Sequence, residues 1–310
     1  MAARPRLAVT LGDPRGIGPE IVARALATPL AAEVTLIGAD DQVGHIPARR
    51  TLGVGVWGQG VGERAGGDGE ERLASAGHLS ARAVEEAVRL ARAGEVDAIV
   101  TGPVHKQALH VAGYRYPGVT EFLSHLMDDA DVAMMLAAGA LRVVLVTTHL
   151  PLREVPDQLT TARVVRVGRT TAAGLTRWWG IERPRLAVCA LNPHAGESGL
   201  FGTEDALVLR PAAEALGAAG PLPADTVFVR ALRGEFDAVL APYHDVGMTA
   251  VKVAGFGKGV NVTLGLPFPR TAPDHGTAFD IAGRGVADPA SMRLALELGA
   301  ELGGREPARR

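Results

Sequence analysis

Short β-branched runs alternate along the chain with longer alanine-rich stretches whose apolar positions recur every three to four residues. The clearest unit begins at Ser80, which can cap a helix that continues at this spacing to Ala91. Gly94 then offers a left-handed helix end, and the apolar run 96–100 predicts a buried strand. Helices and strands that alternate in this way are typical of βαβ units and a mostly parallel sheet.

Further predicted strands end in residues that can carry chemistry. The run 96–100 leads into a polar loop that ends in Lys106. Three further runs each lead into a histidine: 143–146 into His149, 186–191 into His194 and 237–240 into His244. In open α/β sheets, ligands bind beyond the carboxyl ends of the strands. The repeated placement therefore predicts a functional site at that edge of a sheet.

The histidines at these strand ends, His149, His194 and His244, suggest a metal site. Three imidazoles with open positions for water or substrate suit a catalytic zinc or a similar divalent ion. Taken alone, each histidine is better explained as a loop residue that caps backbone groups, whereas the three together favour the metal. Asp245 and Asp274 could orient such ligands, and an ordinary turn or capping role explains them equally well.

Two glycine-rich segments allow different interpretations. The segment 11–20 follows a predicted strand at 7–10 and places Pro19 in the first turn of a helix. Its helix N-terminus could hold an anion or phosphate, and a tight turn that needs glycine explains it equally well. The stretch 47–77 predicts a loop, and the formal G-x-G-x-x-G at 53–58 within it is discounted because no helix opens there.

Composition and charge exclude several classes of protein. The 310 residues, 47% hydrophobic and 21% charged, suit one large or two modest α/β domains. A net charge of −2 and 4% aromatic residues argue against a nucleic-acid partner. There is no apolar stretch of about 18 residues and no signal-peptide pattern, so we expect a cytoplasmic protein without a membrane span. The single cysteine, Cys189, excludes an intramolecular disulfide framework and lies in an apolar run typical of a buried thiol.

Basic and amide residues near the predicted metal would suit an anionic substrate. The candidates are Lys106, Lys252, Lys258, Asn261 and Arg270. A Lys, an Asn and an Arg together can bind carboxylate and phosphate groups. Each of them alone is as well explained as a solvated surface residue.

Several strings, in family order, resemble 4-hydroxythreonine-4-phosphate dehydrogenases, a family of vitamin B6 biosynthesis. They lie at 12–19, 101–106, 147–152, 192–197, 202–204 and 220–226, and in a block that runs from 243 through 274–278 to 283–285. The resemblance implies two α/β/α domains of the isocitrate and isopropylmalate dehydrogenase type with a cleft between them. The first domain would be 1–135, completed by 280–310, and the second 136–279. It also implies a homodimer with the active site at the subunit interface.

The same resemblance implies the reaction and the residues that serve it. It assigns metal ligation, shared between both subunits, to His149, His194 and His244, and substrate contacts to Thr120, Lys252, Asn261 and Arg270, with Lys106 beside them. The implied reaction is NAD- or NADP-dependent oxidation of 4-phosphohydroxy-L-threonine, followed by loss of CO2 to give 3-amino-2-oxopropyl phosphate. A divalent ion, zinc, magnesium or cobalt, would activate the hydroxyl and polarise the ketone. Asp245 and Lys252 are the candidates for the general base, and the residues that bind the nicotinamide cofactor stay unassigned.

One departure from the family motif bears on the substrate. The family reads Gly-His-Thr-Glu where this chain has Val119 between Gly118 and Thr120. Valine cannot replace the hydrogen bond or the charge of an imidazole, and polar pairing sets much of a site's discrimination. A sister dehydrogenase that acts on erythronate or threonate 4-phosphate, or on a cis-dihydrodiol carboxylate, is therefore the alternative. A three-histidine zinc lyase or aldolase that needs no nicotinamide is a third hypothesis, and a non-catalytic binding protein is the least favoured.

Overall fold

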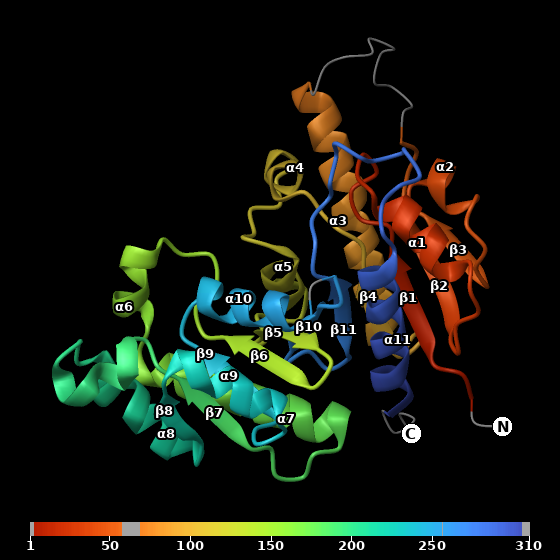
Figure 1. The fold of residues 1–310 in the computed structure, drawn as a ribbon. Helices are drawn as coiled ribbons and strands as arrows, with labels where there is room; N and C mark the ends of the chain where they lie inside the picture. Colours follow the sequence, from red (N-terminus) through yellow and green to blue (C-terminus); the bar gives the residue numbers. More distant parts are fainter. Residues whose placement is uncertain (1–2, 58–68, 256, 306–310) are drawn as a thin grey trace. The chain divides into compact units, whose positions relative to one another are not determined.

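The computed structural model describes residues 3–57, 69–255 and 257–305 and divides into two compact units (Figure 1). Unit 1 consists of Met1–Ala130 with Leu266–Arg310, and unit 2 of Asp131–Gly265. The sequence predicts that the chain passes from the first domain to the second between residues 135 and 136, and returns between residues 279 and 280. In the structure β11 (Arg270–Pro273) belongs to unit 1, because it pairs in parallel with β4 (Ala98–Thr101).

Unit 1 is built on a parallel sheet with the strand order β3-β2-β1-β4-β11. Its other strands are β1 (Arg6–Thr10), β2 (Glu33–Gly38) and β3 (Arg50–Gly53). Helices α1 (Gly18–Leu26) and α11 (Ala290–Arg305) pack together on one face of the sheet. On the other face lies α3 (Glu70–Arg92), against which α4 (Lys106–Val111) and α5 (Val119–Leu126) pack (Figure 1). The short α2 (Asp40–Val43) lies beside β2 and β3.

Unit 2 is built on a mixed sheet with the strand order β10-β5-β6-β9-β7-β8. The strands are β5 (Ala133–Ala138), β6 (Leu141–Leu145), β7 (Leu186–Cys189), β8 (Ala219–Leu222), β9 (Ala238–Ala241) and β10 (Val260–Leu264). β6, β9, β7 and β8 are parallel, whereas β5 runs antiparallel to β6 and to β10.

Helices cover both faces of the unit 2 sheet. α9 (Ala224–Leu232) and α10 (His244–Gly255) lie on one face, and α7 (Thr161–Trp179) with α8 (Arg210–Leu216) on the other. The short helices are η1 (Leu152–Glu154), α6 (Val155–Gln158), η2 (Pro193–Gly199) and η3 (Asp205–Leu209). None of the helices in the described part of the chain is long and apolar enough to cross a membrane.

The structure confirms the predicted strands and the role of Pro19, and it corrects one helix start. Strands lie at or within a few residues of all five predicted runs, and Pro19 lies in the first turn of α1. Ser80 is not a helix cap, because α3 already begins at Glu70. Its buried hydroxyl donates instead to the carbonyl of Ala76, 2.8 Å away, as serine inside a helix often does. β3 and the start of α3 also fall in the stretch 47–77 that was expected to be loop.

Candidate active site

Two of the predicted histidines come together in unit 2. β6 and β9 are parallel neighbours, with Leu145 opposite Ala241, so the loops that follow them leave the sheet side by side. The ring centroids of His149 and His244 lie 5.7 Å apart, with their planes at 42°. Imidazole nitrogens bind zinc at about 2.0–2.1 Å, and two rings at this separation can share one such ion. The pair therefore fits a divalent metal as two of its ligands.

The loops that carry this pair are fixed to each other. The backbone N–H of Val146 donates to the carbonyl of Ala241 at 2.9 Å. The buried hydroxyl of Thr147 donates to the carbonyl of Pro242 at 2.7 Å. These two hydrogen bonds continue the contact between β6 and β9 beyond the strands. They therefore hold the loops of His149 and His244 next to each other.

His194 lies apart from this pair. No group of three or more His, Cys, Asp or Glu residues within the described residues of one chain could hold a metal ion. His194 instead lies near Phe201, with ring centroids 6.3 Å apart and planes at 45°, and helps to line a pocket of about 360 Å³. Asn192 and Tyr243, which follow β7 and β9, line the same pocket together with Asp225 in the first turn of α9.

The two aspartates proposed to orient ligands have different surroundings. Asp245 Oδ1 lies 2.7 Å from His244 Nδ1, so the carboxylate can hold the ring with Nε2 left for a ligand. Asp274 lies in unit 1, where its Oδ1 accepts a hydrogen bond from Ser291 Oγ at 3.1 Å. Asp245 thus contacts a predicted metal ligand, whereas Asp274 contacts a serine at the start of α11.

Arg270 is a buried cation in unit 1. Only 4% of the residue is exposed, and its Nη2 donates to the hydroxyl of Thr101. Burial lowers the pKa of the guanidinium to about 10, although the nearby Glu121 carboxylate acts in the opposite direction. The side chain therefore stays protonated at neutral pH, and a buried positive charge suits a phosphate or carboxylate ligand.

Lys106 and Thr120 lie near the same helix end. α5 begins at Val119, so Thr120 is in its first turn. A Cβ added to Gly118 would lie 3.1 Å from Glu121 Oε2 and 3.9 Å from Lys106 Cε, which places the lysine stem beside this turn.

The remaining substrate candidates belong to unit 2. Lys252 lies on α10 and Asn261 on β10. The buried Oδ1 of Asn261 has no hydrogen-bond partner within the described residues. Buried polar atoms are almost always satisfied in folded proteins, so this oxygen is suited to a ligand that supplies a donor.

The segment 11–20 is engaged in packing. Gly12 has φ +79°, and a Cβ there would lie 2.2 Å from the carbonyl oxygen of Pro103. The N–H groups of Gly16 and Ile17, just before α1, donate to carbonyls of the chain at 3.0 and 2.9 Å. These contacts favour the tight-turn interpretation over the anion site.

This segment also contains a buried ion pair that the sequence did not indicate. The carboxylate of Asp13 is fully buried and binds Arg15 through Oδ2 and Nη2, 2.8 Å apart. The guanidinium of Arg15 lies 4.8 Å from the ring centre of Phe279, and His105 meets the same ring edge-on at 5.1 Å. The cluster joins the loops after β1, β4 and β11 in unit 1.

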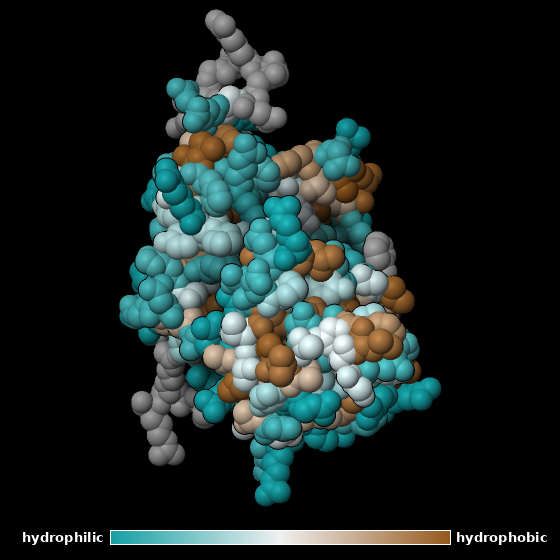
Figure 2. Space-filling view, turned by 90° about the vertical axis from the view of Figure 1, so that its left-hand side faces the viewer, coloured by the Kyte–Doolittle hydropathy of each residue, from teal (hydrophilic) through white to brown (hydrophobic). Residues whose placement is uncertain are grey.

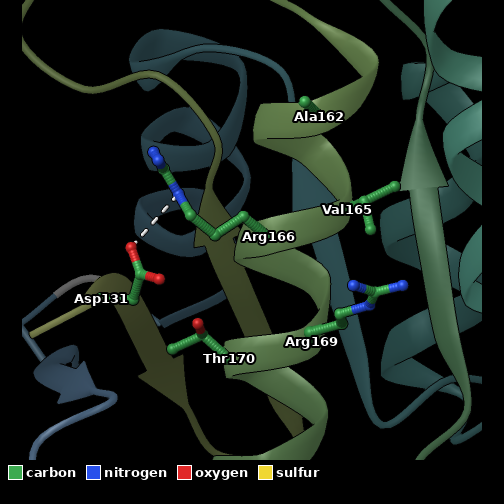
Figure 3. Close-up of a pocket in the computed structure, with 6 residues that line it drawn as sticks. All are labelled: Asp131, Ala162, Val165, Arg166, Arg169 and Thr170. Atoms are coloured by element: carbon green, nitrogen blue, oxygen red, sulfur yellow. Dashed lines mark ion pairs between the residues drawn. The ribbon is translucent and has the colours of Figure 1, made fainter.

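A second hollow, of about 440 Å³, lies on α7 (Figure 3). Arg166, Arg169 and Thr170 line it, and Arg166 Nε lies 3.5 Å from Asp131 Oδ1. None of the predicted site residues lines this hollow, so it forms no part of the candidate site.

Comparisons with known proteins identify the family. Residues 53–299 match the family model described as "Pyridoxal phosphate biosynthetic protein PdxA". The chain belongs to this family. It is 44% identical over 325 residues to a 4-hydroxythreonine-4-phosphate dehydrogenase of Beijerinckia indica subsp. indica, covering 96% of this chain and 94% of that one. The family and the α/β fold expected from the sequence are confirmed.

Two further relatives of this PdxA-family chain bear on substrate and fold. It is 41% identical over 322 residues to a D-threonate 4-phosphate dehydrogenase of Pectobacterium atrosepticum, covering 96% of this chain and 98% of that one. Among solved structures, a 4-hydroxythreonine-4-phosphate dehydrogenase from Klebsiella pneumoniae superposes with a TM-score of 0.83 at 40% identity, covering 98% and 99% of the two chains. The similarity therefore extends over nearly the whole chain.

Proposed function

We propose that the protein is a metal-dependent dehydrogenase that oxidises and decarboxylates 4-phosphohydroxy-L-threonine to 3-amino-2-oxopropyl phosphate in vitamin B6 biosynthesis, with NAD or NADP as the oxidant. The observation that carries this proposal is the pair of imidazoles of His149 and His244, 5.7 Å apart at the carboxyl ends of adjacent parallel strands. Similarity over nearly the full chain to proteins named 4-hydroxythreonine-4-phosphate dehydrogenase also supports the proposal. The cytoplasmic location stays a prediction from the sequence.

The metal would take its third imidazole from a second copy of the chain. His149 and His244 fit two ligand positions, whereas His194 belongs to no three-residue group within the described residues of one chain. The segment that follows His194 exposes Leu200 and Leu207 at 72% and 70%, and exposed apolar side chains of this size favour a protein partner. Figure 2 shows apolar patches set among hydrophilic residues on one face of the molecule. We therefore propose a homodimer with His194 supplied across its interface.

Each group of the chain would have a defined task. A bound zinc, magnesium or cobalt ion would lower the pKa of the substrate hydroxyl and stabilise the negative charge that develops during decarboxylation. The cations of Arg270 and Lys106 would bind the phosphate group, with Lys252, Asn261 and Thr120 as further substrate contacts. Asp245 would hold His244 in its ligating orientation, and Asp245 or Lys252 would accept the hydroxyl proton.

The test is an assay of the purified chain with a divalent metal, NAD or NADP and 4-phosphohydroxy-L-threonine. We expect reduced nicotinamide and CO2 to form in equal amounts, because one hydride and one carboxyl group leave each substrate molecule. The variant His194→Ala is expected to lose both bound metal and turnover. Full activity of that variant would refute the ligand assignment, and absence of turnover by the metal-loaded wild type would refute the proposed function.

A sister activity on threonate 4-phosphate is the second candidate. Val119 stands where the family motif has histidine, and the chain is 41% identical to a D-threonate 4-phosphate dehydrogenase. Both substrates carry the 4-phosphate that Arg270 and Lys106 would bind. Comparison of kcat/KM for the two acids in the same assay separates the candidates.

A further inference from the structure

The segment that carries His194 has an unusual backbone. All five residues from 194 to 198 have positive φ, with values of 52°, 55°, 80°, 40° and 58°. Gly196 adopts such angles readily, but His194, Ala195, Glu197 and Ser198 each carry a Cβ that clashes in a left-handed turn. A run of this kind persists only when the surrounding structure holds it in place. The contacts that hold it therefore determine where the His194 ring points.

A buried carboxylate anchors the chain immediately before this turn. Asp205 is 1% exposed. Its Oδ1 accepts the backbone N–H of Leu191 at 2.8 Å, and its Oδ2 accepts that of Asn192 at 3.0 Å. The two bonds together fix both the position and the orientation of the peptides that lead into His194.

A second contact closes the segment. The side-chain amide of Asn192 donates to Glu204 Oε2 at 2.8 Å. Gly202, with φ +125°, lies against this bond, and a Cβ there would be 2.6 Å from Asn192 Nδ2 and 2.7 Å from Glu204 Oε2. The backbone N–H of Phe201 also donates to the carbonyl of Gly196 at 3.2 Å. The residues after the turn are thus tied to the residues before it.

We propose that Asp205 is a positioning residue, which sets the direction of the His194 imidazole by holding the backbone of Leu191 and Asn192, with the Asn192–Glu204 bond as a weaker second support. This inference rests on the proposed function, in which His194 binds the metal. A carboxylate that served only to stabilise the fold would behave like Asp237. That residue accepts the backbone N–H of Arg185 at 2.7 Å at the opposite end of the same strand pair, β7 and β9.

Asp205→Asn tests the proposal with little change in shape. The new carboxamide can accept one of the two N–H groups, but its own NH2 group then faces the other donor, and a buried donor is left unsatisfied. We expect faster backbone hydrogen exchange at Leu191 and Asn192 in the metal-free protein. We also expect zinc affinity to fall about 10–100-fold, the usual effect of removing a group that orients a ligand.

Asp237→Asn is the matched control, because it removes the same kind of carboxylate–backbone bond from the same strand pair. It is expected to lower the unfolding temperature without changing zinc affinity or exchange at Leu191 and Asn192. Glu204→Gln weakens the second contact without leaving a buried charge, and we expect a smaller loss of zinc affinity, less than about tenfold. It decides the proposal if Asp205→Asn does not fold.

These measurements distinguish a failure of the positioning role of Asp205 from a failure of the proposed metal-dependent activity. Wild-type zinc affinity and wild-type exchange in both Asp205→Asn and Glu204→Gln, or equal effects in Asp237→Asn, would overturn the positioning role. A wild-type protein that neither binds zinc nor turns over would overturn the proposed function instead. In that case the exchange measurement, which needs no metal, still tests whether Asp205 orders the segment.

Discussion

At the amino ends of their strands the two units have the same corner, in which an aspartate binds an arginine at the start of the neighbouring strand. At the carboxyl ends of their strands the two units carry different chemical groups. In unit 1, Asp97 precedes β4, and one of its carboxylate oxygens accepts the backbone N–H of Arg6 at 2.7 Å. Its other oxygen accepts a hydrogen bond from the guanidinium of Arg6 at 2.6 Å. In unit 2, Asp237 precedes β9 and makes the equivalent contacts with Arg185 at 2.7 and 2.9 Å. Each aspartate thus clamps two adjacent parallel strands where they enter the sheet.

The turns that lead into these corners also correspond. The sequences 94–98 and 234–238 read Gly-Glu-Val-Asp-Ala and Gly-Glu-Phe-Asp-Ala. Gly94 and Gly234 have φ of 69° and 81° and end α3 and α9 in the same way. The glutamate that follows each glycine pairs with an arginine of the preceding helix. Such a corner fixes where two neighbouring strands enter the sheet.

At the opposite ends the two units diverge. β4 leads to Thr101, whose hydroxyl binds the buried cation of Arg270, whereas β9 leads to His244 and its imidazole neighbour His149. At this end unit 1 thus has a buried cation, whereas unit 2 has a pair of imidazole rings. We infer that these corners stabilise the strand arrangement, whereas the groups at the carboxyl ends differ between the two units. Substitutions at the two ends of one strand should therefore have separable effects.

The largest expected effect is that of His244→Ala at the carboxyl end of β9. If His244 binds a metal as proposed, its loss should remove several kcal/mol of transition-state stabilisation, which corresponds to a fall in kcat/KM of about 10³-fold or more. Asp237→Asn, at the amino end of the same strand, should keep kcat/KM near the wild-type value. Steady-state kinetics and metal content of the two variants check this. A folded His244→Ala variant that retained its metal, or an Asp237→Asn variant that lost it, would contradict the separation.

Arg270→Lys should have the next largest effect, at the charged end of unit 1. Lysine keeps a positive charge but loses the planar fork of donors, and a hydrogen bond to a charged group contributes about 1.5–3 kcal/mol. We therefore expect KM for a phosphorylated substrate to rise about 10- to 150-fold, with a smaller change in kcat.

The pH profile sharpens this prediction. Burial lowers the pKa of Arg270 to about 10, so the wild-type cation persists through neutral pH and is lost only as the pH rises through that value. A lysine in the same buried position starts from a lower pKa and is depressed further, so its KM should begin to rise at a lower pH. Identical KM–pH profiles for the two proteins would show that residue 270 does not bind the phosphate.

The sequence predicted those parts of the fold and site that depend on local pattern. Runs of apolar, β-branched residues predicted the strands. The histidines shortly after these runs predicted the edge of the sheet at which His149 and His244 lie close together. The pattern did not reveal that β6 and β9 are neighbours, since sheet order depends on tertiary packing. His194 follows its strand in the same way, yet a single chain does not bring it to the pair.

Asp205 shows why the remaining features could not be predicted. Acidic residues are usually exposed, and this one is buried only because the chain folds back onto the end of β7. The left-handed turn before it includes residues that rarely adopt positive φ, and Gly196 and Gly202 were the only local hint. Long-range hydrogen bonds determine this segment, and a sequence pattern does not encode them.

The smallest expected effects are those of Gly94→Ala and Gly234→Ala, which test whether the two corners are equivalent. No atom beyond the chain neighbours lies within 4 Å of a Cβ at either position, so the cost comes from the left-handed backbone alone. Each substitution should lower the free energy of unfolding by about 1 kcal/mol, and the double variant by the sum, because the sites share no contacts. Denaturant titration measures these values, and kcat/KM should stay unchanged in all three proteins. A loss of activity confined to Gly234→Ala would mean that the amino corner of unit 2 is coupled to the histidine pair, and that the two ends of β9 are not independent.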